Sequence, residues 1–508
     1  MEFKLTEEAI RSSIIYEGSS EQAVDCEIML PDYCPDISRI LKCQMIPKVV
    51  SAQPNGTKLM LEGTTKVKIL YVNEDGIIHT YEQTVAYQAS SGIEDDLAGA
   101  SIKTSQKVSY VNCHAITGRK IDVHGAFSIN FKATVPSEAQ VLSDIEADNI
   151  ELCKENLSQS KYVGEVQKSF TATETFELAS GKPSIEAIIR SCASAKLDDA
   201  KVIAGKIILK GEIPVKVLYR TDKGHGSTDI MEYTIPISNI IDFDGIDDRC
   251  VTNVTLEVFD AEMAIKTDSD GECRLIESEI KITVSACAYE PCETAIIKDL
   301  YSTEYNTVVT EKNIKSSTVA CNISDTFISK ESFDLPEDGI TQIIDMWCEP
   351  LSLKQSESDD GIVLKGQNNV CMLTADDSLT LSYYERVSDF EYAVKNISNT
   401  NNIKCDASHS ILGTTYSMSA SGIEVRNEIS ISGLVMNVQN IKTVASVEAA
   451  DKIDKNKYSA LIIYYADTGE AVWDIAKKYC TSAKLIMEEN ELEQDEIDKA
   501  KMLLIPIC

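Results

Sequence analysis

The sequence predicts a mainly β, α+β multidomain chain. We expect three repeated antiparallel units, sandwich-like or barrel-like with short helices, and then a small βααβ module. Three observations support this architecture: a motif that recurs three times in the same register, period-two alternation of apolar residues in each repeat, and a switch from strand to helix patterning over the last fifty residues. With 508 residues, the chain is also too long for a single hydrophobic core.

A shared glycine anchors the threefold repeat. Ile residues lie 26 positions before this glycine in all three copies, and a second Ile follows three residues later. Leu, Val and Leu then recur at fixed offsets around the glycine. The equivalent residues are Ile37, Ile185 and Ile340; Ile40, Ile188 and Ile343; Leu61, Leu209 and Leu364; Gly63, Gly211 and Gly366; Val67, Val215 and Val370; and Leu70, Leu218 and Leu373. A period of roughly 150 residues is the size of a domain rather than of a solenoid repeat.

Each repeat has the same expected plan. The Ile pair at i and i+3 predicts one short helix at its start. Alternating segments such as 67–72 follow, bounded by turn residues such as 73–76, and they predict strands of sheets with one solvated face. Because glycine weakens strands, the shared glycine indicates a bulge or a close backbone approach.

The repeats set the expected domain boundaries. We assign residues 1–155 to the first repeat, 156–308 to the second and 309–447 to a divergent third one, and we expect this third unit to be mainly a spacer. The segments 149–164 and 301–319 are polar and are expected to form loose connections. Residues 448–456 form a charged linker, and residues 457–508 form the C-terminal module.

The pattern of residues 457–508 predicts the order strand, helix, helix and strand. An apolar strand is followed by a glycine turn at Gly469 and by a helix with Val472, Ile475 and Ala476 on one face. A second short helix carries Leu485 and Ile486, and a strand over 502–506 closes the segment. So small a unit has little room for a catalytic cleft, and we therefore expect it to bind another molecule.

Composition excludes several functions. A net charge of −33 argues against nucleic acid as a partner, because phosphates require Lys and Arg. No run of 18 apolar residues is present, so no membrane span is expected, and the first residues lack a signal-peptide core, which predicts a cytosolic protein. The 43% of hydrophobic residues predicts ordinary globular domains.

The chemistry-bearing residues form no catalytic or metal-binding pattern. The 16 cysteines include no C-x-x-C pair and read as thiols, most of them small core residues. The histidines, which lack metal spacing, are His79, His114, His124, His225 and His409. The acidic segment 242–248 lacks the distal Glu of a calcium loop and is expected to form a turn. We therefore expect no catalytic residue, no metal and no cofactor.

The C-terminal module resembles a LysM domain. The residues that carry the resemblance are Gly469, Val472, Trp473, Ile475, Ala476, Tyr479, Asn490, Leu492 and the closing Leu503-Leu504-Ile505-Pro506. The family binds N-acetylglucosamine polymers through two loops. Both loops differ here, because Glu470-Ala471 replaces the usual Asp-Thr and Lys499-Ala500 replaces Pro-Gly.

The repeats resemble the SPOCS-domain family of spore coat proteins. The resemblance lies in the stretch LPDYCPDISRIL at residues 30–41 and in the pattern L-x-G-x-x-x-V-K-x-L-Y of the first two repeats. The third repeat departs from this pattern at Cys371 and Thr374. Tandem SPOCS units followed by one LysM domain are similar to the SipL type of coat morphogenetic protein in clostridia, and SpoVID of bacilli joins the same two elements.

The resemblance implies a non-enzymatic scaffold that assembles the spore coat around the forespore, in the mother-cell cytoplasm at the forespore surface. Its implied partners are the ATPase of the coat basement layer and other coat proteins. The candidate partner-binding residues are Ile463, Gly469, Glu470, Ala471, Val472, Trp473, Leu485, Met487, Asn490 and Leu492. Trp473 is either a core residue or part of this surface. The alternative function is a module that binds peptidoglycan or N-acetylglucosamine in the spore envelope; a wall hydrolase is disfavoured because no nucleophile–base set is visible.

Overall fold

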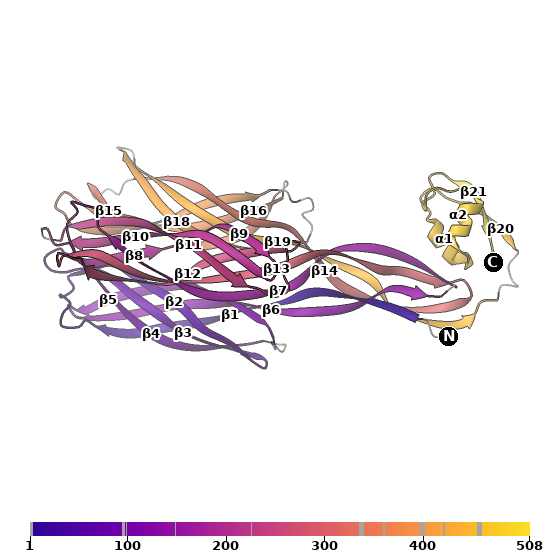
Figure 1. The fold of residues 1–508 in the computed structure, drawn as a ribbon, viewed down its shortest axis with the longest axis horizontal. Helices are drawn as coiled ribbons and strands as arrows, with labels where there is room; N and C mark the ends of the chain where they lie inside the picture. The colour runs from indigo at the N-terminus through magenta and orange to yellow at the C-terminus, as the bar shows by residue number, and fades with distance from the viewer. Residues whose placement is uncertain are drawn as a thin grey trace.

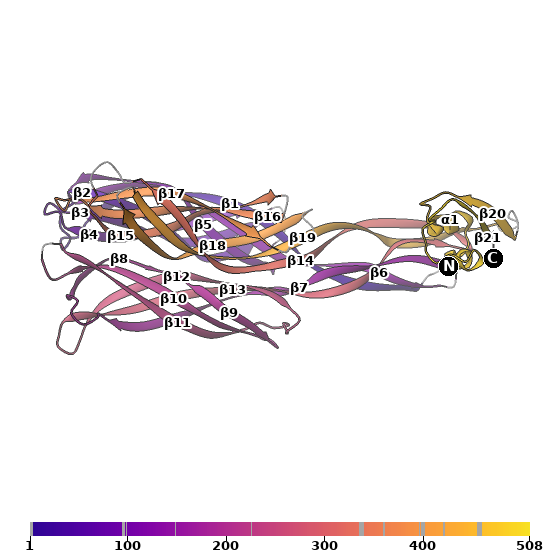
Figure 2. The same ribbon diagram turned by 90° about the horizontal axis from the view of Figure 1, so that it is seen from above.

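The computed structural model describes residues 4–507, except 94–96, 98, 148, 225, 335–339, 359, 360, 396, 398–401, 420, 421 and 455–459. The molecule is elongated. A broad head made of sheets narrows into a stalk, and a small module with the C-terminus lies at the far end of the stalk (Figures 1 and 2). His225 and residues 335–339, which precede the first Ile of the third repeat, lie outside the described residues.

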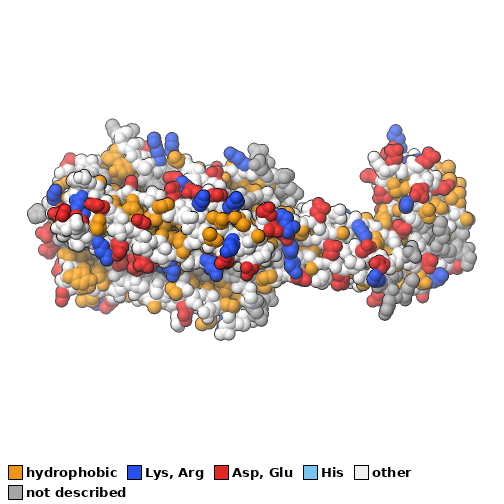
Figure 3. All heavy atoms as spheres, viewed as in Figure 1, with side chains coloured by type: hydrophobic (Ala, Val, Ile, Leu, Met, Phe, Trp, Pro, Cys, Tyr) orange, Lys and Arg blue, Asp and Glu red, His pale blue; other side chains and the backbone are white. Residues whose placement is uncertain are grey.

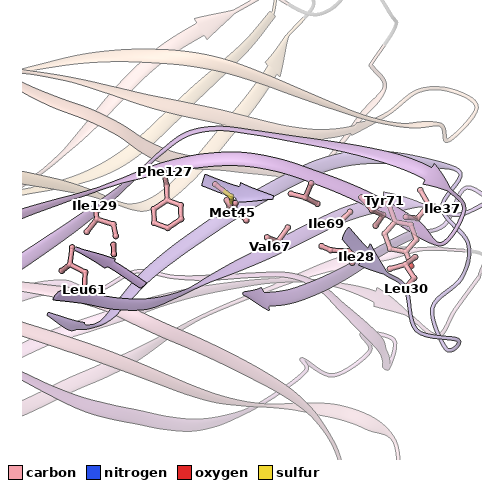
Figure 4. Packing of buried hydrophobic residues seen from close by; sticks show 14 of the residues in the cluster. Ile28, Leu30, Ile37, Met45, Leu61, Val67, Ile69, Tyr71, Phe127 and Ile129 are labelled. Carbon is pink, nitrogen blue, oxygen red and sulfur yellow. The ribbon is translucent and has the colours of Figure 1, made fainter. Parts of the chain in front are cut away.

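The first unit (residues 4–146) contains two antiparallel sheets with strand orders β1-β6-β5 and β2-β3-β4. Their apolar faces meet in one core, in which side chains from β1, β2, β3 and β6 point toward one another (Figure 4). On β3, the alternating Val67, Ile69 and Tyr71 are fully buried in this core. The strands are β1 (Lys4–Met29), β2 (Arg39–Asn55), β3 (Lys58–Val72), β4 (Ile78–Gly92), β5 (Ser101–Thr117) and β6 (Lys120–Glu146).

The second and third units (residues 150–302 and 305–452) repeat this plan. Their sheets have the orders β12-β13-β7 and β11-β10-β8, with β9 beside β10, and then β14-β19-β18 and β15-β16-β17. The second unit comprises β7 (Ile150–Glu177), β8 (Ile185–Ala193), β9 (Lys196–Ile203), β10 (Lys206–Thr221), β11 (Thr228–Asp242), β12 (Val251–Thr267) and β13 (Cys273–Ser302). The third comprises β14 (Tyr305–Phe333), β15 (Gln342–Ser358), β16 (Gly361–Ala375), β17 (Leu381–Val394), β18 (Ile403–Ser419) and β19 (Gly422–Lys452).

Two local expectations are wrong. The segments that carry the Ile pairs are not helical. Strand β8 contains both Ile residues of its pair, whereas Ile37 and Ile340 precede β2 and β15, which contain Ile40 and Ile343. The polar connections at 149–164 and 301–319 are not loose either, because most of their residues belong to the long strands β7 and β14. Strand β19 also runs to Lys452, into the expected linker.

The shared glycine lies where a neighbouring strand bulges toward it. The β2–β3 register shifts between Val49 and Ser51, opposite Gly63, and the β9–β10 register shifts beside Gly211. A Cβ atom at Gly63 would overlap the carbonyl oxygen of Lys48, and one at Gly211 would overlap that of Lys196. At Gly366 the ring of Phe390 fills the space instead. The close backbone approach expected from the sequence is therefore present in the first two units, whereas in the third unit a side chain takes its place.

The three units share buried side chains in the head. The head cluster combines Leu70 and Ile78 of the first unit, Ile189 and Leu218 of the second, and Trp347, Cys371 and Leu373 of the third. Leu70, Leu218 and Leu373 occupy the same position in the three repeats, so the cluster lies on an approximate threefold axis. The three units thus pack into one body. The sequence pattern had predicted three separate domains, without this shared cluster.

Ion pairs between units surround this cluster. The carboxylate of Asp345, which is 1% exposed, lies 2.8 Å from Arg190 Nε and 2.8 Å from Lys216 Nζ of the second unit. Lys42 of the first unit reaches Glu349, Glu385 and the Tyr383 hydroxyl of the third. The third unit therefore holds the other two in place, contrary to the expectation that it is mainly a spacer.

The stalk has the same approximate symmetry. Three antiparallel ribbons, β1–β6, β7–β13 and β14–β19, run side by side (Figure 2). Equivalent residues of the three ribbons meet in the stalk cluster, which comprises Leu142, Ile145, Ile297, Leu300, Val444 and Val447. Polar residues also connect the ribbons, since Ser160 Oγ accepts the Val319 amide at 2.9 Å and Thr443 donates to the Ile297 carbonyl at 3.0 Å.

His409 makes the stability of the third unit depend on pH. Its ring lies against Phe390, its Nε2 lies 2.8 Å from Asn368 Oδ1, and burial lowers the pKa to about 4. The unfolded chain binds the proton from about pH 6.5 downward, whereas the folded chain resists it. We expect up to about 3 kcal/mol of stability to be lost as pH falls from 6.5 to 4. Urea denaturation across this range should show a smaller loss for His409→Asn, and equal curves would contradict the assignment.

Candidate functional site

The C-terminal module contains β20 (Leu461–Ala466), α1 (Val472–Tyr479), α2 (Ala483–Glu489) and β21 (Lys501–Pro506), in the order that the sequence predicts. Strands β20 and β21 pair antiparallel, and both helices lie on one face of this ribbon (Figure 1). Val472, Ile475, Ala476, Ile486, Leu503 and Ile505 form its buried core. Val472 is therefore a core residue and presents no side chain to a partner.

Other candidate residues hold the module together. The Asn490 amide donates to the carbonyls of Ile486 and Leu504 at 2.8 and 2.7 Å, and its Oδ1 accepts the Leu504 amide at 2.7 Å. Met487 and Leu492 pack partly buried against the core. Leu485 on α2 is half-buried. The candidates thus do not gather on one face, and Asn490 joins α2 to β21.

The two loops that flank the helices are joined to each other. The Gly469 amide donates to the Ile497 carbonyl at 2.8 Å, and the Ile497 amide donates to the Glu470 carbonyl at 2.9 Å. Glu470 Oε1 accepts the hydroxyl of Tyr464 at 2.9 Å, and Oε2 accepts the amide of Asp467 at 3.0 Å. These backbone groups are engaged with each other and present few free donors to a ligand.

Helix α1 begins at a residue that cannot cap it. Ala471 occupies the N-cap position and makes no side-chain hydrogen bond, as its residue type requires. Asp495 from the second loop compensates, because its carbonyl accepts the Val472 amide at 2.7 Å and its carboxylate accepts the Trp473 amide at 3.2 Å. The loss of a local cap is thus compensated by a contact between the two loops.

Trp473 holds the module against the stalk, where it contacts Asp299 and Tyr301; we name these two residues the seat. Its indole Nε1 donates to Asp299 at 2.9 Å, and its ring lies edge-on to Tyr301 with centroids 5.0 Å apart. The Tyr301 hydroxyl donates to the Thr481 carbonyl at 2.7 Å, and Lys477 pairs with Asp299 at 2.6 Å. Burial alone would raise the pKa of Asp299, but the hydrogen bonds from Lys477 and Trp473 hold it below its usual value. Trp473 therefore belongs to an internal interface.

Of the three equivalent ribbons of the stalk, only that of the second unit carries an aspartate and a tyrosine at the positions of the seat. The position of Asp299 is taken by Asp144 in the first unit, where it pairs with Lys154 at 2.8 Å, and by Ser446 in the third. The position of Tyr301 is taken by Glu146 and Glu448. An aromatic side chain and a carboxylate together select this single seat.

Loss of the seat should release the module from the stalk. In a Tyr301→Ala, Asp299→Asn double variant, the ring contact with Trp473, the hydrogen bond from the Tyr301 hydroxyl and the ion pair with Lys477 are all lost. Small-angle scattering should show a broader distribution of intramolecular distances while the circular dichroism spectrum is unchanged. The exposed pair Lys365–Glu391 provides a matched control, Glu391→Gln. Identical scattering of the double variant and the parent would contradict the seat.

The opposite face of the module is apolar and open. In the β20–β21 register, Ile463 pairs with Leu504 and Tyr465 with Met502, so these side chains share the face that points away from the helices. We name this the outer face. Ile463, Tyr465 and Met502 are 58%, 76% and 52% exposed. Figure 3 shows hydrophobic side chains along this outer margin of the module. The residues of the outer face are Leu461, Ile463, Tyr465, Met502, Leu504 and Pro506.

Sequence reasoning found only one residue of this face, Ile463. A signal for the others was available, because the run Leu461-Ile-Ile-Tyr-Tyr465 is apolar at every position. A strand with one solvated face should alternate, so an unbroken run in a two-stranded sheet indicates that both faces make contacts. An exposed apolar patch rimmed by polar residues is typical of an interaction site.

Metal-binding clusters and membrane-spanning helices were two further features to consider outside the module. Within the described part of the chain, no group of three or more His, Cys, Asp or Glu side chains is arranged to hold a metal ion. His124 is exposed on the β5–β6 hairpin between Asp25 and Asp122, which raise its pKa by hydrogen bonding. Among the described residues there is no helix both long and apolar enough to cross a membrane.

The comparison with protein families identifies the repeats. A family model described as "SipL, SPOCS domain" matches residues 36–116 and 184–266, which span β2 to β5 and β8 to most of β12. Two segments of the chain, one in the first unit and one in the second, are thus similar to the SPOCS domain of SipL. This match supports a SipL-like protein and suggests a role related to sporulation and the spore coat. No curated protein and no solved structure matches it.

Proposed function

We propose that this chain is a non-enzymatic scaffold for spore coat assembly and that its C-terminal module docks the ATPase of the coat basement layer. The module is proposed to be a LysM domain, and the three units are proposed to be SPOCS-type domains, the third divergent. The site of action would be the mother-cell cytoplasm at the forespore surface. The units of the head would add contacts to further coat proteins, and linked contacts would increase avidity.

The outer face is the observation that carries this proposal. Aliphatic and aromatic anchors dominate protein–protein interfaces, and Ile463, Tyr465 and Met502 are such residues in an exposed group. The seat formed by Asp299 and Tyr301 fixes the opposite side of the module, so the outer face points away from the stalk. A rigidly held patch loses little conformational freedom when it binds a partner.

Several contacts argue for protein rather than glycan as the ligand. In the LysM family the glycan-binding loops correspond to the segments around Gly469 and before β21. Here their backbone groups bond to each other, and Trp473 is engaged with Asp299 and Tyr301. Sugar recognition requires free hydrogen-bond donors and an accessible aromatic surface. The exposed aromatic ring, Tyr465, lies on the outer face instead.

Binding of the basement-layer ATPase to the full-length chain tests this proposal. Ile463→Glu places a charge in the centre of the outer face and should weaken binding at least 100-fold, since burial of an unpaired charge costs several kcal/mol. Ile240→Glu is the matched control, because Ile240 is 57% exposed in the head. Chitooligosaccharide titration should give no binding or millimolar binding. Full ATPase binding by Ile463→Glu, or micromolar glycan binding, would contradict the proposal.

A further inference from the structure

Three cysteines of the first unit lie together at one side of its sandwich. Cys26 is on β1, Cys43 on β2 and Cys113 on β5, and all three pack partly buried against the same hydrophobic core. Strand β2 is an edge of one sheet and β5 is an edge of the other, and the two edges pack against each other. Cys43 and Cys113 therefore lie on facing edge strands. We name this the open side of the sandwich, because no backbone pairing joins the two sheets there among the described residues.

The two thiols lie close enough to interact with each other. Their interaction raises the pKa of the Cys43 thiol and lowers that of the Cys113 thiol. Cys26 lies near both, but the register separates it from Cys113: each of these residues pairs with Val123 from opposite sides. Their backbones are thus about 10 Å apart, beyond the reach of a disulfide bond.

We propose that Cys43 and Cys113 form a reversible disulfide bond that closes the open side of the first unit. The oxidant is a low-molecular-weight disulfide. The Cys113 thiolate attacks one sulfur of the oxidant, which forms a mixed disulfide and releases one small thiol. Cys43 then loses its proton and attacks the Cys113 sulfur, which forms the Cys43–Cys113 bond and releases the second small thiol. Two protein thiols are oxidised, and one small disulfide is reduced to two thiols.

The bond would convert a contact between two edges into a covalent closure. Residues 44–112, with β3 and β4, lie in the loop that it closes, and cross-links across long loops restrict the unfolded chain strongly. Reduced chains would leave the first unit able to open along the β2–β5 side, and oxidised chains would hold it closed. Oxidation after assembly would therefore fix this domain in place, whichever partner the C-terminal module binds.

Equilibration of the full-length chain in buffers of oxidised and reduced glutathione tests the proposal. We expect peptide mapping under non-reducing conditions to recover a Cys43–Cys113 cross-linked peptide that is lost on reduction. Cys43→Ser and Cys113→Ser should each abolish it, whereas Cys26→Ser should retain it.

The oxidised parent should also unfold at a higher temperature than the reduced one, and that difference should vanish in Cys43→Ser. Glutathione buffers that oxidise other cysteines but leave Cys43 and Cys113 as thiols would overturn the proposal. A dominant Cys26–Cys113 peptide would do the same. Circular dichroism of each variant confirms that it is folded, and none of these readouts depends on the coat ATPase.

Discussion

Replacement of Asp345 by asparagine should destabilise the folded chain by about 3–5 kcal/mol, the loss expected when one partner of a buried ion pair is removed. Its carboxylate is almost inaccessible and neutralises both Arg190 and Lys216. Without it, two cations of the second unit remain buried beside the head cluster. The effect should therefore reach both units rather than the third alone.

The repeat register explains why this carboxylate is essential. Asp345 occupies the position of Lys42 in the first repeat and Arg190 in the second, and Cys371 occupies that of Lys68 and Lys216. Three copies with cations at both positions would bring six positive charges to the axis, and like charges in a low-dielectric interior repel strongly. Divergence of the third repeat thus supplies the complementary charge.

Denaturant titration of Asp345→Asn measures this effect, with Glu391→Gln as the control on an exposed pair of the same unit. Glu391 and Lys365 lie 2.9 Å apart with side chains that are 64% and 57% exposed, so the control should change stability by less than about 1 kcal/mol. Equal, small losses in both variants would show that the three units do not depend on this charge.

Gly63→Ala should cost about 3 kcal/mol, a large penalty for a single methyl group. The new Cβ would overlap the Lys48 carbonyl oxygen, which belongs to the backbone and cannot rotate away, and it would also meet the Tyr87 ring. Overpacking of this kind forces backbone shifts. The same reasoning applies to Gly211, which faces the Lys196 carbonyl.

Gly92→Ala is the matched control, because Gly92 lies in the same sheet and no atom lies within 4 Å of its added Cβ. It should leave stability within about 0.5 kcal/mol of the parent. Thermal unfolding of the two variants distinguishes them. A Gly63→Ala variant as stable as Gly92→Ala would mean that the bulge in β2 relaxes freely.

Alternation of apolar residues predicted the strands of the repeats. The spacing of the Ile pairs predicted short helices, and strands are found there instead. In β8, Ile185 and Ile188 are three residues apart, yet they pair with Thr221 and Tyr219 because a bulge inserts one residue between them. They therefore share one face of a strand with the spacing of a helix. In the other two repeats the first Ile precedes the strand, so its spacing to the next carries no secondary-structure information.

An unbroken run of apolar residues at the end of β3 indicated that the three units pack together. Such a run does not fit the alternation expected of a strand with one solvated face. Ile69, Leu70, Tyr71 and Val72 are all buried, although a half-exposed strand should alternate. Ile69 and Tyr71 face the core of the first unit, whereas Leu70 faces the head cluster. Such an unbroken run at the end of an alternating strand indicates burial on both faces. The polar stalk was harder to foresee, because Gln159 and Ser160 are buried there through hydrogen bonds.

The module was predictable in its elements but not in its contacts. The spacing of Val472, Ile475 and Ala476 predicts the buried face of α1, as observed. The seat of Trp473 depends on Asp299 and Tyr301, which are more than 170 positions away in sequence and carry no motif. Single-sequence patterns contain no information about such a contact, so the choice between core and surface for Trp473 could not be made from them.

Site-specific photo-crosslinking in sporulating cells tests the central claim most directly. A photoreactive residue is placed at Tyr465 on the outer face, and in a second strain at Ile240 in the head, both of which are largely exposed. We predict that the coat basement-layer ATPase is captured from position 465 and not from position 240. Capture from position 240 alone, with position 465 silent in a correctly folded chain, would contradict docking through the C-terminal module.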